Sequence, residues 1–151
     1  MIRALLIAGL IAGGILAKTV EITSDTFEAS QKELISKFIG NVTFKSDNER
    51  LKADKVFLYF DKNKKPIKVE AIGYVRFFIT DRGKSYEGEA ARVVFYPKKK
   101  EYILYGNVKV IQKPGKKILY AEEIHIDLVN SKLVVKGKEK KPVKMIFSVD
   151  E

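Results

Sequence analysis

The sequence contains no cysteine, and its 151 residues include a single histidine, His125. The absence of cysteine excludes disulfide bonds, thiolate metal ligands and a lipid anchor attached to cysteine. A lone histidine cannot assemble any of the common zinc sites, so we predict no metal site. The same histidine would have to serve as the base of any Ser-His-Asp triad, and no Gly-x-Ser-x-Gly motif is present to supply the serine.

Motifs for nucleotide cofactors are also missing. The sequence has neither a Gly-x-Gly-x-x-Gly loop nor a Walker loop. No motif among the acidic residues nominates a pair of carboxylates for hydrolysis. We therefore predict that the protein needs no cofactor and is not an enzyme. A secreted hydrolase of an acidic glycan, with a carboxylate pair assembled only by folding, is the enzymatic alternative.

Basic residues outnumber acidic residues in this sequence. The chain has 29 Lys and Arg residues against 19 Asp and Glu residues, which gives a formal net charge of +10. Such a surplus indicates an anionic partner, unless it only solvates the surface. The basic runs at 62–65, 98–100, 116–117 and 138–141 fall in predicted turns, and lysine greatly outnumbers arginine. Both features disfavour nucleic acid as the partner.

Only the N-terminus carries a long hydrophobic run. One positive charge, Arg3, precedes an apolar run from residue 4 to residue 17. This run suits the core of a signal peptide and is shorter than the roughly 20 residues that span a bilayer. We interpret residues 1–17 as a cleaved signal peptide and residues 18–151 as one exported domain. The alternative is a membrane anchor that stays attached.

The rest of the chain repeats a short strand motif. The segments GNVTF, GYVRF and GNVKV begin at Gly40, Gly73 and Gly106, at intervals of 33 residues. Apolar and polar side chains alternate after each glycine, as in a half-buried strand. Each glycine predicts a bend or a close approach of the backbone. We therefore predict that each of these glycines opens a strand.

A second type of strand follows each repeat. It reads LKADKVFLYFD at 51–61, YEGEAARVVFYP at 86–97 and LYAEEIHIDL at 119–128, and ITSDTFEAS at 22–30 is a weaker copy. Turn signals rich in Asp, Asn, Gly and Pro separate the strands. The sequence therefore predicts an all-β domain built from repeated antiparallel strand pairs.

One segment, residues 28–38, is ambiguous. Leu34, Ile35 and Phe38 have the spacing of a helix face. We favour a turn followed by a strand, because the other repeats place strands at this position.

Both ends of the mature chain predict edge strands. TVEIT at 19–23 begins the sheet, and the alternating residues of KKPVKMIFSVDE at 140–151 end it. Natural proteins usually protect such edges, and Lys144 is the visible protection on the last strand.

The order and spacing of these motifs resemble the OstA-like family of periplasmic lipopolysaccharide-transport proteins, which includes LptA. The sequence departs from the family pattern at Tyr74, where Asn is usual, and at Ala91, where Asp is usual. Nearly all of the mature chain takes part in the resemblance, through residues 22–25, 40–42, 51–61, 67–75, 90–96 and 106–108.

The resemblance implies a single twisted, V-shaped β-jellyroll with an apolar interior and open edge strands at both ends. It implies a non-enzymatic periplasmic carrier that moves lipopolysaccharide from the inner to the outer membrane. Such carriers stack head to tail with themselves and with jellyroll subunits at both membranes, through strand addition at their edges. The predicted docking-edge residues are Val20, Ile22, Val143, Met145, Phe147 and Val149. An alternative is a jellyroll scaffold subunit of the same export pathway that keeps residues 1–17 as an anchor.

Inward-facing apolar residues are the candidates for contact with the lipid A part of lipopolysaccharide. Acyl chains prefer such a surface by about 0.8 kcal/mol per buried CH₂, and lysines in the turns are placed to meet phosphates. The same residues are also the expected core, and the sequence leaves open whether they hold lipid or only pack together. They are Phe27, Phe38, Val42, Phe44, Val56, Leu58, Phe60, Val75, Phe77, Val93, Phe95, Val108, Val110, Ile124 and Ile126.

Overall fold

The structure is a computed structural model that describes residues 19, 21–81 and 83–149. The predicted signal peptide, residues 1–17, and the predicted edge residue Val20 lie outside the described residues. Within these ranges the chain forms ten strands in one antiparallel sheet and no helix, so the predicted all-β fold is confirmed. Accordingly, the described residues provide no helix of the length and apolarity needed to cross a membrane.

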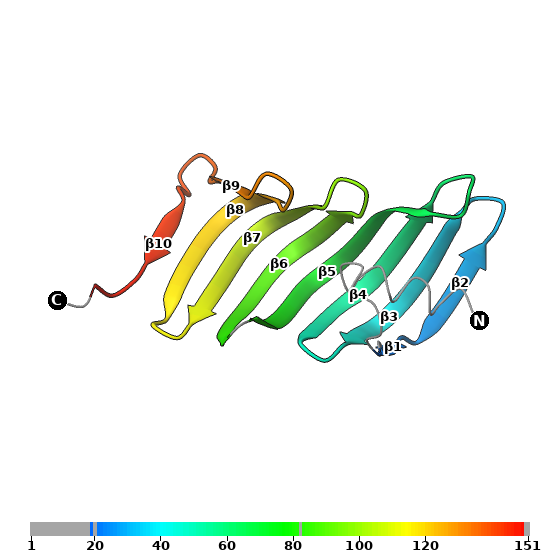
Figure 1. The fold of residues 1–151 in the computed structure, drawn as a ribbon, viewed down its shortest axis with the longest axis horizontal. Coiled ribbons are helices and arrows are strands. Elements are labelled where there is room, and N and C mark those ends of the chain that lie inside the picture. Colours follow the sequence, from blue (N-terminus) through cyan, green and yellow to red (C-terminus); the bar gives the residue numbers. More distant parts are fainter. Residues whose placement is uncertain (1–18, 20, 82, 150–151) are drawn as a thin grey trace.

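Six long strands form the body of the sheet, and short strands complete its two ends (Figure 1). Each long strand pairs with the next one along the chain. The long strands are β3 (Ile35–Lys45), β4 (Glu49–Phe60), β5 (Pro66–Asp81), β6 (Lys84–Tyr96), β7 (Glu101–Lys113) and β8 (Lys117–Asp127). At one end β1 (Glu21–Thr23) and β2 (Thr26–Ser30) both pair with β3, and at the other β9 (Lys132–Lys136) and β10 (Lys144–Ile146) both pair with β8.

The ambiguous segment 28–38 contains a turn and a strand, as predicted. β2 ends at Ser30, and β3 begins at Ile35 after a turn. Pairing of the two strands across the turn buries Phe38 on β3. Tertiary pairing therefore overrides the helical spacing of the sequence.

Bulges bend the sheet near the middle of its long strands. The pairing register shifts at Gly40 on β3, at Gly73 on β5 and at Gly106 on β7. Gly40 has a φ of 85° and Asn41 a φ of 46°, and the pairs that begin at Gly73 and Gly106 have similar positive angles. Two successive left-handed residues turn the strand while the ladder resumes beyond them.

The prediction that each glycine opens a strand is wrong, although the predicted bend is confirmed. Gly40, Gly73 and Gly106 lie inside long strands, because the bulge absorbs the left-handed residues and pairing continues on both sides. A neighbouring segment of the chain comes very close at each bulge. A Cβ atom at Gly73 would lie 2.3 Å from Oδ2 of Asp54, and one at Gly106 would lie 2.7 Å from Cβ of Ala91.

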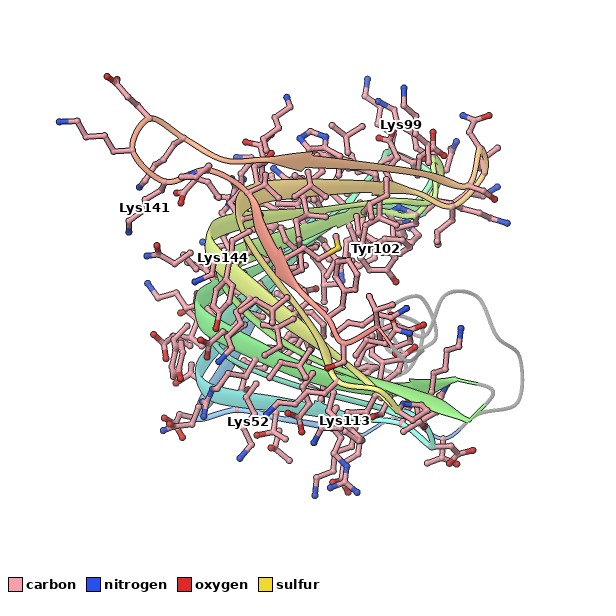
Figure 2. All side chains as sticks on the ribbon, turned by 90° about the vertical axis from the view of Figure 1, so that its left-hand side faces the viewer. Lys52, Lys99, Tyr102, Lys113, Lys141 and Lys144 are labelled. Atoms are coloured by element: carbon pink, nitrogen blue, oxygen red, sulfur yellow. The ribbon has the colours of Figure 1, made fainter. Side chains whose placement is uncertain are left out.

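The bend divides the sheet into two arms, which meet at one side and diverge at the other (Figure 2). We call the surface that each arm turns toward the other the inner face, and the opposite surface the outer face. The first arm comprises residues 26–39, 55–72, 92–105 and 123–136, and the second comprises residues 21–23, 42–53, 75–81, 83–90, 108–121 and 144–146.

Apolar side chains from both arms pack together on the inner face. One cluster joins Leu58 of the first arm with Val42 and Val75 of the second, and each of these is at most 1% exposed. A second cluster joins Leu104 and Ile124 of the first arm with Val108 and Ala90 of the second. Full burial of a side chain of the size of Leu58 contributes about 1.5–3 kcal/mol, so this contact holds the arms together.

The bulge glycines can be tested with Gly73→Ala, with Gly115→Ala as the matched control. Both glycines have a φ of 89°, but only a Cβ at Gly73 meets a neighbour, whereas none lies within 4 Å at Gly115. We expect urea unfolding to show a loss of about 1–2 kcal/mol for Gly115→Ala from the left-handed backbone alone. Gly73→Ala is expected to lose at least about 1 kcal/mol more, because β4 must shift. Equal losses would show that close approach at the bulge has no energetic role.

Candidate functional site

All fifteen predicted inward residues lie on the inner face of the sheet. Phe27 pairs with Phe38 across β2 and β3, and Phe38 pairs with Val56 on β4. The rings of Phe27 and Phe38 are tilted against each other with centroids 4.9 Å apart. Their contact with a lipid stays a prediction, because orientation alone does not identify what they touch.

Burial separates these residues into a core and an accessible group. Nine of them, from Phe38 to Ile124, are at most 7% exposed and form the core described above. Phe27 is 46% exposed on the edge strand β2. The half-buried members are Phe60, Phe77, Val93, Val110 and Ile126. Within the fifteen predicted residues, apolar surface that a ligand can contact therefore belongs to Phe27 and the half-buried members.

Sequence reasoning missed the inner-face residues that precede the glycines of β5 and β7. Val69 and Leu104 are buried, and Tyr102 is half-buried with its ring stacked on Phe95 at a centroid distance of 4.3 Å. Alternation of Tyr102 and Leu104 in EYILYG was the available signal. It was missed because the strand was expected to begin at Gly106.

Tyr102 connects the two apolar clusters of the inner face. It packs against both clusters, and Figure 2 shows it on the inner side of the upper layer. Burial, followed by the negative charge of Glu49 on the other arm, raises the pKa of Tyr102 to about 12. The phenol therefore stays neutral over the physiological range, and the inner face around it carries no charge from this residue.

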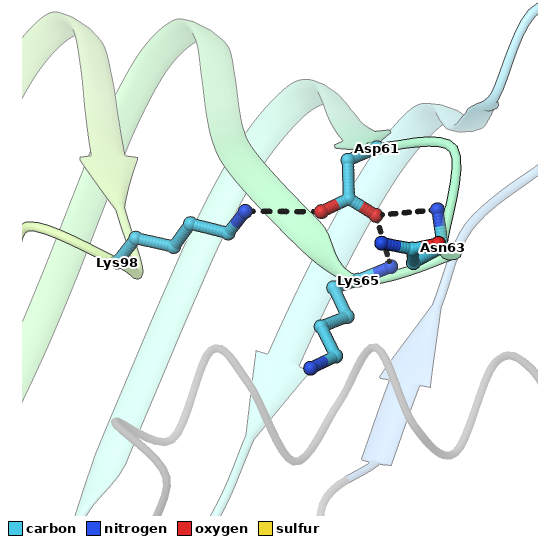
Figure 3. A network of polar contacts seen from close by, with 4 residues as sticks. All are labelled: Asp61, Asn63, Lys65 and Lys98. Carbon is cyan, nitrogen blue, oxygen red and sulfur yellow. Dashed lines mark hydrogen bonds and ion pairs between the residues drawn. The ribbon is translucent and has the colours of Figure 1, made fainter.

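Lysines crowd two neighbouring turns at the tip of the first arm. We call Lys62, Lys64, Lys65, Lys98, Lys99 and Lys100 the tip lysines; they follow β4 and β6. Figure 3 shows Lys98 reaching from one turn to Asp61 in the other, with Nζ 3.0 Å from Oδ2. Of the ion pairs among the described residues, this is the only one that a tip lysine makes.

Asp61 fixes the turn that presents these lysines. Its Oδ1 accepts hydrogen bonds from the backbone N–H of Lys65 at 2.9 Å and of Asn63 at 2.8 Å. The Lys65 N–H, followed by the Lys98 ammonium, holds the pKa of the Asp61 carboxyl below its usual range. Asp61 thus stays ionised and neutralises one lysine, while the other tip lysines keep their charge available.

The C-terminal edge strand is shorter than the sequence suggested. On the inner face Ile22 of β1 pairs with Phe44, and Met145 of β10 pairs with Leu119. The strand expected over 143–149 covers only Lys144–Ile146, because Ile146 already pairs with Ile118 and β8 begins at Lys117. Outside the strand, Val143, Phe147 and Val149 are 39%, 53% and 76% exposed.

His125 faces outward on β8, as predicted, and is half-buried. Its Nε2 contacts Oε2 of Glu123, and Nζ of Lys136 lies 3.9 Å from the same oxygen. Across the ranges that the structure covers, no group of three or more His, Cys, Asp and Glu side chains is placed to hold a metal ion.

Comparison with known proteins gives a family and a similar structure. Residues 21–132 match a family model described as LptA/(LptD N-terminal domain) LPS transport protein. Among solved structures, a similar chain is LptH of Pseudomonas aeruginosa, described as the LptA homologous periplasmic component of the conserved lipopolysaccharide transport device. The two chains are 16% identical and have a TM-score of 0.71, and the match covers 87% of this chain and 96% of LptH. No curated protein matches the sequence.

The elevated pKa of Tyr102 predicts a pH-dependent contribution to stability. Because the folded-state pKa of about 12 exceeds the unfolded value near 10, the contribution is complete below pH 10 and disappears between pH 10 and 12. Urea unfolding of the wild type and of Tyr102→Phe should therefore show a difference that changes by about 2–3 kcal/mol across this interval. A difference that does not depend on pH would contradict the burial of the phenol.

Proposed function

This chain belongs to the LptA and LptD N-terminal domain family of lipopolysaccharide transport proteins, and on that premise we propose that it is a periplasmic carrier and bridge. It binds the acyl chains of lipopolysaccharide on its inner face and moves the lipid from the inner to the outer membrane. It acts as a binding protein and not as an enzyme. The half-buried apolar residues of the inner face are the observation that carries the proposal.

The inner face has the chemistry that acyl chains require. Phe60, Phe77, Val93, Val110 and Ile126 keep part of their apolar surface accessible between the arms. Each CH₂ that leaves water for such a surface gains about 0.8 kcal/mol. The neutral Tyr102 phenol between the two clusters avoids placing a charge among the chains.

The tip lysines support the proposed binding of the phosphates of lipopolysaccharide. Lipopolysaccharide places phosphates beside its acyl chains, and Figure 2 shows Lys99 at the free end of the upper layer, where the arms diverge. Among the described residues, the only ammonium group that pairs with Asp61 is that of Lys98. The remaining ammonium groups are therefore available for phosphates while the acyl chains lie further inside.

Sheet ends support head-to-tail assembly. The two ends of the sheet carry different strands, β1 and β2 at one and β9 and β10 at the other. Pairing of one end with the opposite end of another subunit is a heterologous contact, which extends into a filament if it does not close. The proposed partners are further copies of this chain and jellyroll subunits at the two membranes. We expect residues 1–17 to direct export and to be cleaved, so the mass of the mature protein should lack them.

Photo-crosslinking tests the inner face directly. A benzoyl-phenylalanine at position 60 or 126 is expected to capture lipopolysaccharide in cells, because Phe60 and Ile126 are accessible on the inner face. Positions 59 and 125 are matched controls, since Tyr59 and His125 are half-buried neighbours on the outer face. Capture at positions 59 and 125 but not at 60 and 126 would overturn the proposal.

Charge removal tests the tip lysines. The triple variant Lys62→Gln, Lys64→Gln, Lys99→Gln is expected to weaken lipopolysaccharide binding about tenfold or more, because several charge-assisted contacts to phosphate are lost. The control changes Lys37, Lys55 and Lys68 to Gln on the outer face of the same arm, which removes the same net charge. Binding would be measured by titration at one salt concentration. Equal weakening of binding in both variants would show that the tip lysines act only through the net charge of the protein.

A further inference from the structure

A hollow lies on the outer face of the second arm, away from the inner face. Its volume is about 430 Å³, which is within the range of small-molecule sites. Four cationic side chains from three strands line it: Arg50 and Lys52 of β4, Arg76 of β5 and Lys109 of β7. Their positions alternate with the inner-face residues of the same strands, and Figure 2 shows Lys52 beside the lower layer.

The four cations of this hollow outnumber the two carboxylates that line it, Glu87 and Glu89. None of the four belongs to an ion pair of the described chain. Lys52 and Arg76 are directly opposite each other on paired strands, an arrangement of like charges that destabilises a sheet. Aromatic rings hold two of them in place, since the Arg76 guanidinium lies 4.8 Å from the Tyr74 ring centroid and the Lys109 ammonium 5.7 Å from that of Tyr120. A bound anion would relieve the repulsion.

Two glutamates and Phe78 also line the hollow, together with Leu51, Phe77, Gly88 and Ile111. Glu89 lies opposite Arg76, and Glu87 lies opposite Phe78, which is 37% exposed. The Tyr74 hydroxyl donates to Oε2 of Glu89 at 3.3 Å. The hollow therefore offers cationic donors, carboxylate acceptors and an apolar ring within one site.

We propose that this hollow binds a phosphorylated sugar. The phosphate is held by Arg76, Arg50 and Lys52, whose charge and donors suit phosphate oxygens. Sugar hydroxyls donate to the carboxylates of Glu87 and Glu89, and the apolar face of the sugar ring covers Phe78. An acidic peptide would bring further carboxylates against both glutamates, so the lining favours the sugar. The site goes beyond the proposed lipid binding, because none of its ligands belongs to the apolar inner face.

An NMR titration of the ¹⁵N-labelled protein tests the assignment, with N-acetylglucosamine 1-phosphate as the probe. We expect amide shifts confined to the strands around the hollow, at residues 50–52, 76–78, 87–89 and 109. N-acetylglucosamine and inorganic phosphate, each titrated alone, are expected to bind at least tenfold more weakly. Equal binding of inorganic phosphate, tighter binding of a glutamate-rich peptide at the same residues, or no localised shift would overturn the proposal.

Variants separate this site from the inner face. Arg76→Gln is expected to weaken sugar-phosphate binding about tenfold, since it removes a charged donor. Lys55→Gln, an exposed lysine on the outer face of the first arm, is the control and should leave binding unchanged. Loss of binding in both variants, or in neither, would contradict the site.

Two further measurements relate the hollow to the lipid cargo. Arg76→Gln should leave crosslinking of lipopolysaccharide at position 60 unchanged, so the two proposals can fail independently. Deacylated lipopolysaccharide retains the sugars and phosphates without acyl chains. Tighter binding of this molecule than of the monosaccharide phosphate supports the site and identifies its ligand as the head group of the lipid cargo. Equal binding of the two supports the site and identifies its ligand as a free sugar phosphate.

Discussion

Repeated left-handed bulges determine how this sheet folds over on itself. At Gly40 and Asn41 two successive positive φ angles turn β3, and the chain is held there by the Asp25 N–H, which donates to the Gly40 carbonyl at 2.8 Å. The Asn41 amide donates to Oδ2 of Asp25 at 2.9 Å. Because the same bulge recurs on β5 and β7, the bends align, and one sheet brings its own apolar surface face to face.

The bend also assigns different chemistry to different surfaces. Close to the bend the inner face is buried core, around Leu58 and Val75. Further along the arms, side chains such as Phe60 and Ile126 keep accessible apolar surface, and the tip lysines lie beyond them in the turns. The outer face of the second arm carries a separate cationic hollow around Arg76. A single folded sheet thus provides an apolar surface, a charged rim and a polar site without a second domain.

Much of this fold could be predicted from the sequence, because period-2 alternation reports directly on the face of a strand. The inward orientation of Val42, Phe44 and the related residues follows from it. The glycines were misplaced at strand starts, because a local signal for left-handed backbone does not distinguish a turn from a bulge. The Lys52–Arg76 pair and the Asp61–Lys98 contact join residues far apart in sequence, so only the register and the turn positions reveal them.

Paramagnetic NMR measures how closely the acyl chains of lipopolysaccharide approach the inner face. The protein, with its isoleucine and valine methyl groups labelled, would be titrated with lipopolysaccharide that carries a nitroxide on an acyl chain. The methyl signals of Val110 and Ile126 on the inner face are predicted to broaden, while those of Ile103 and Ile118 on the outer face stay sharp. Broadening of Ile103 and Ile118 with unchanged Val110 and Ile126 would show that the acyl chains lie against the outer face instead.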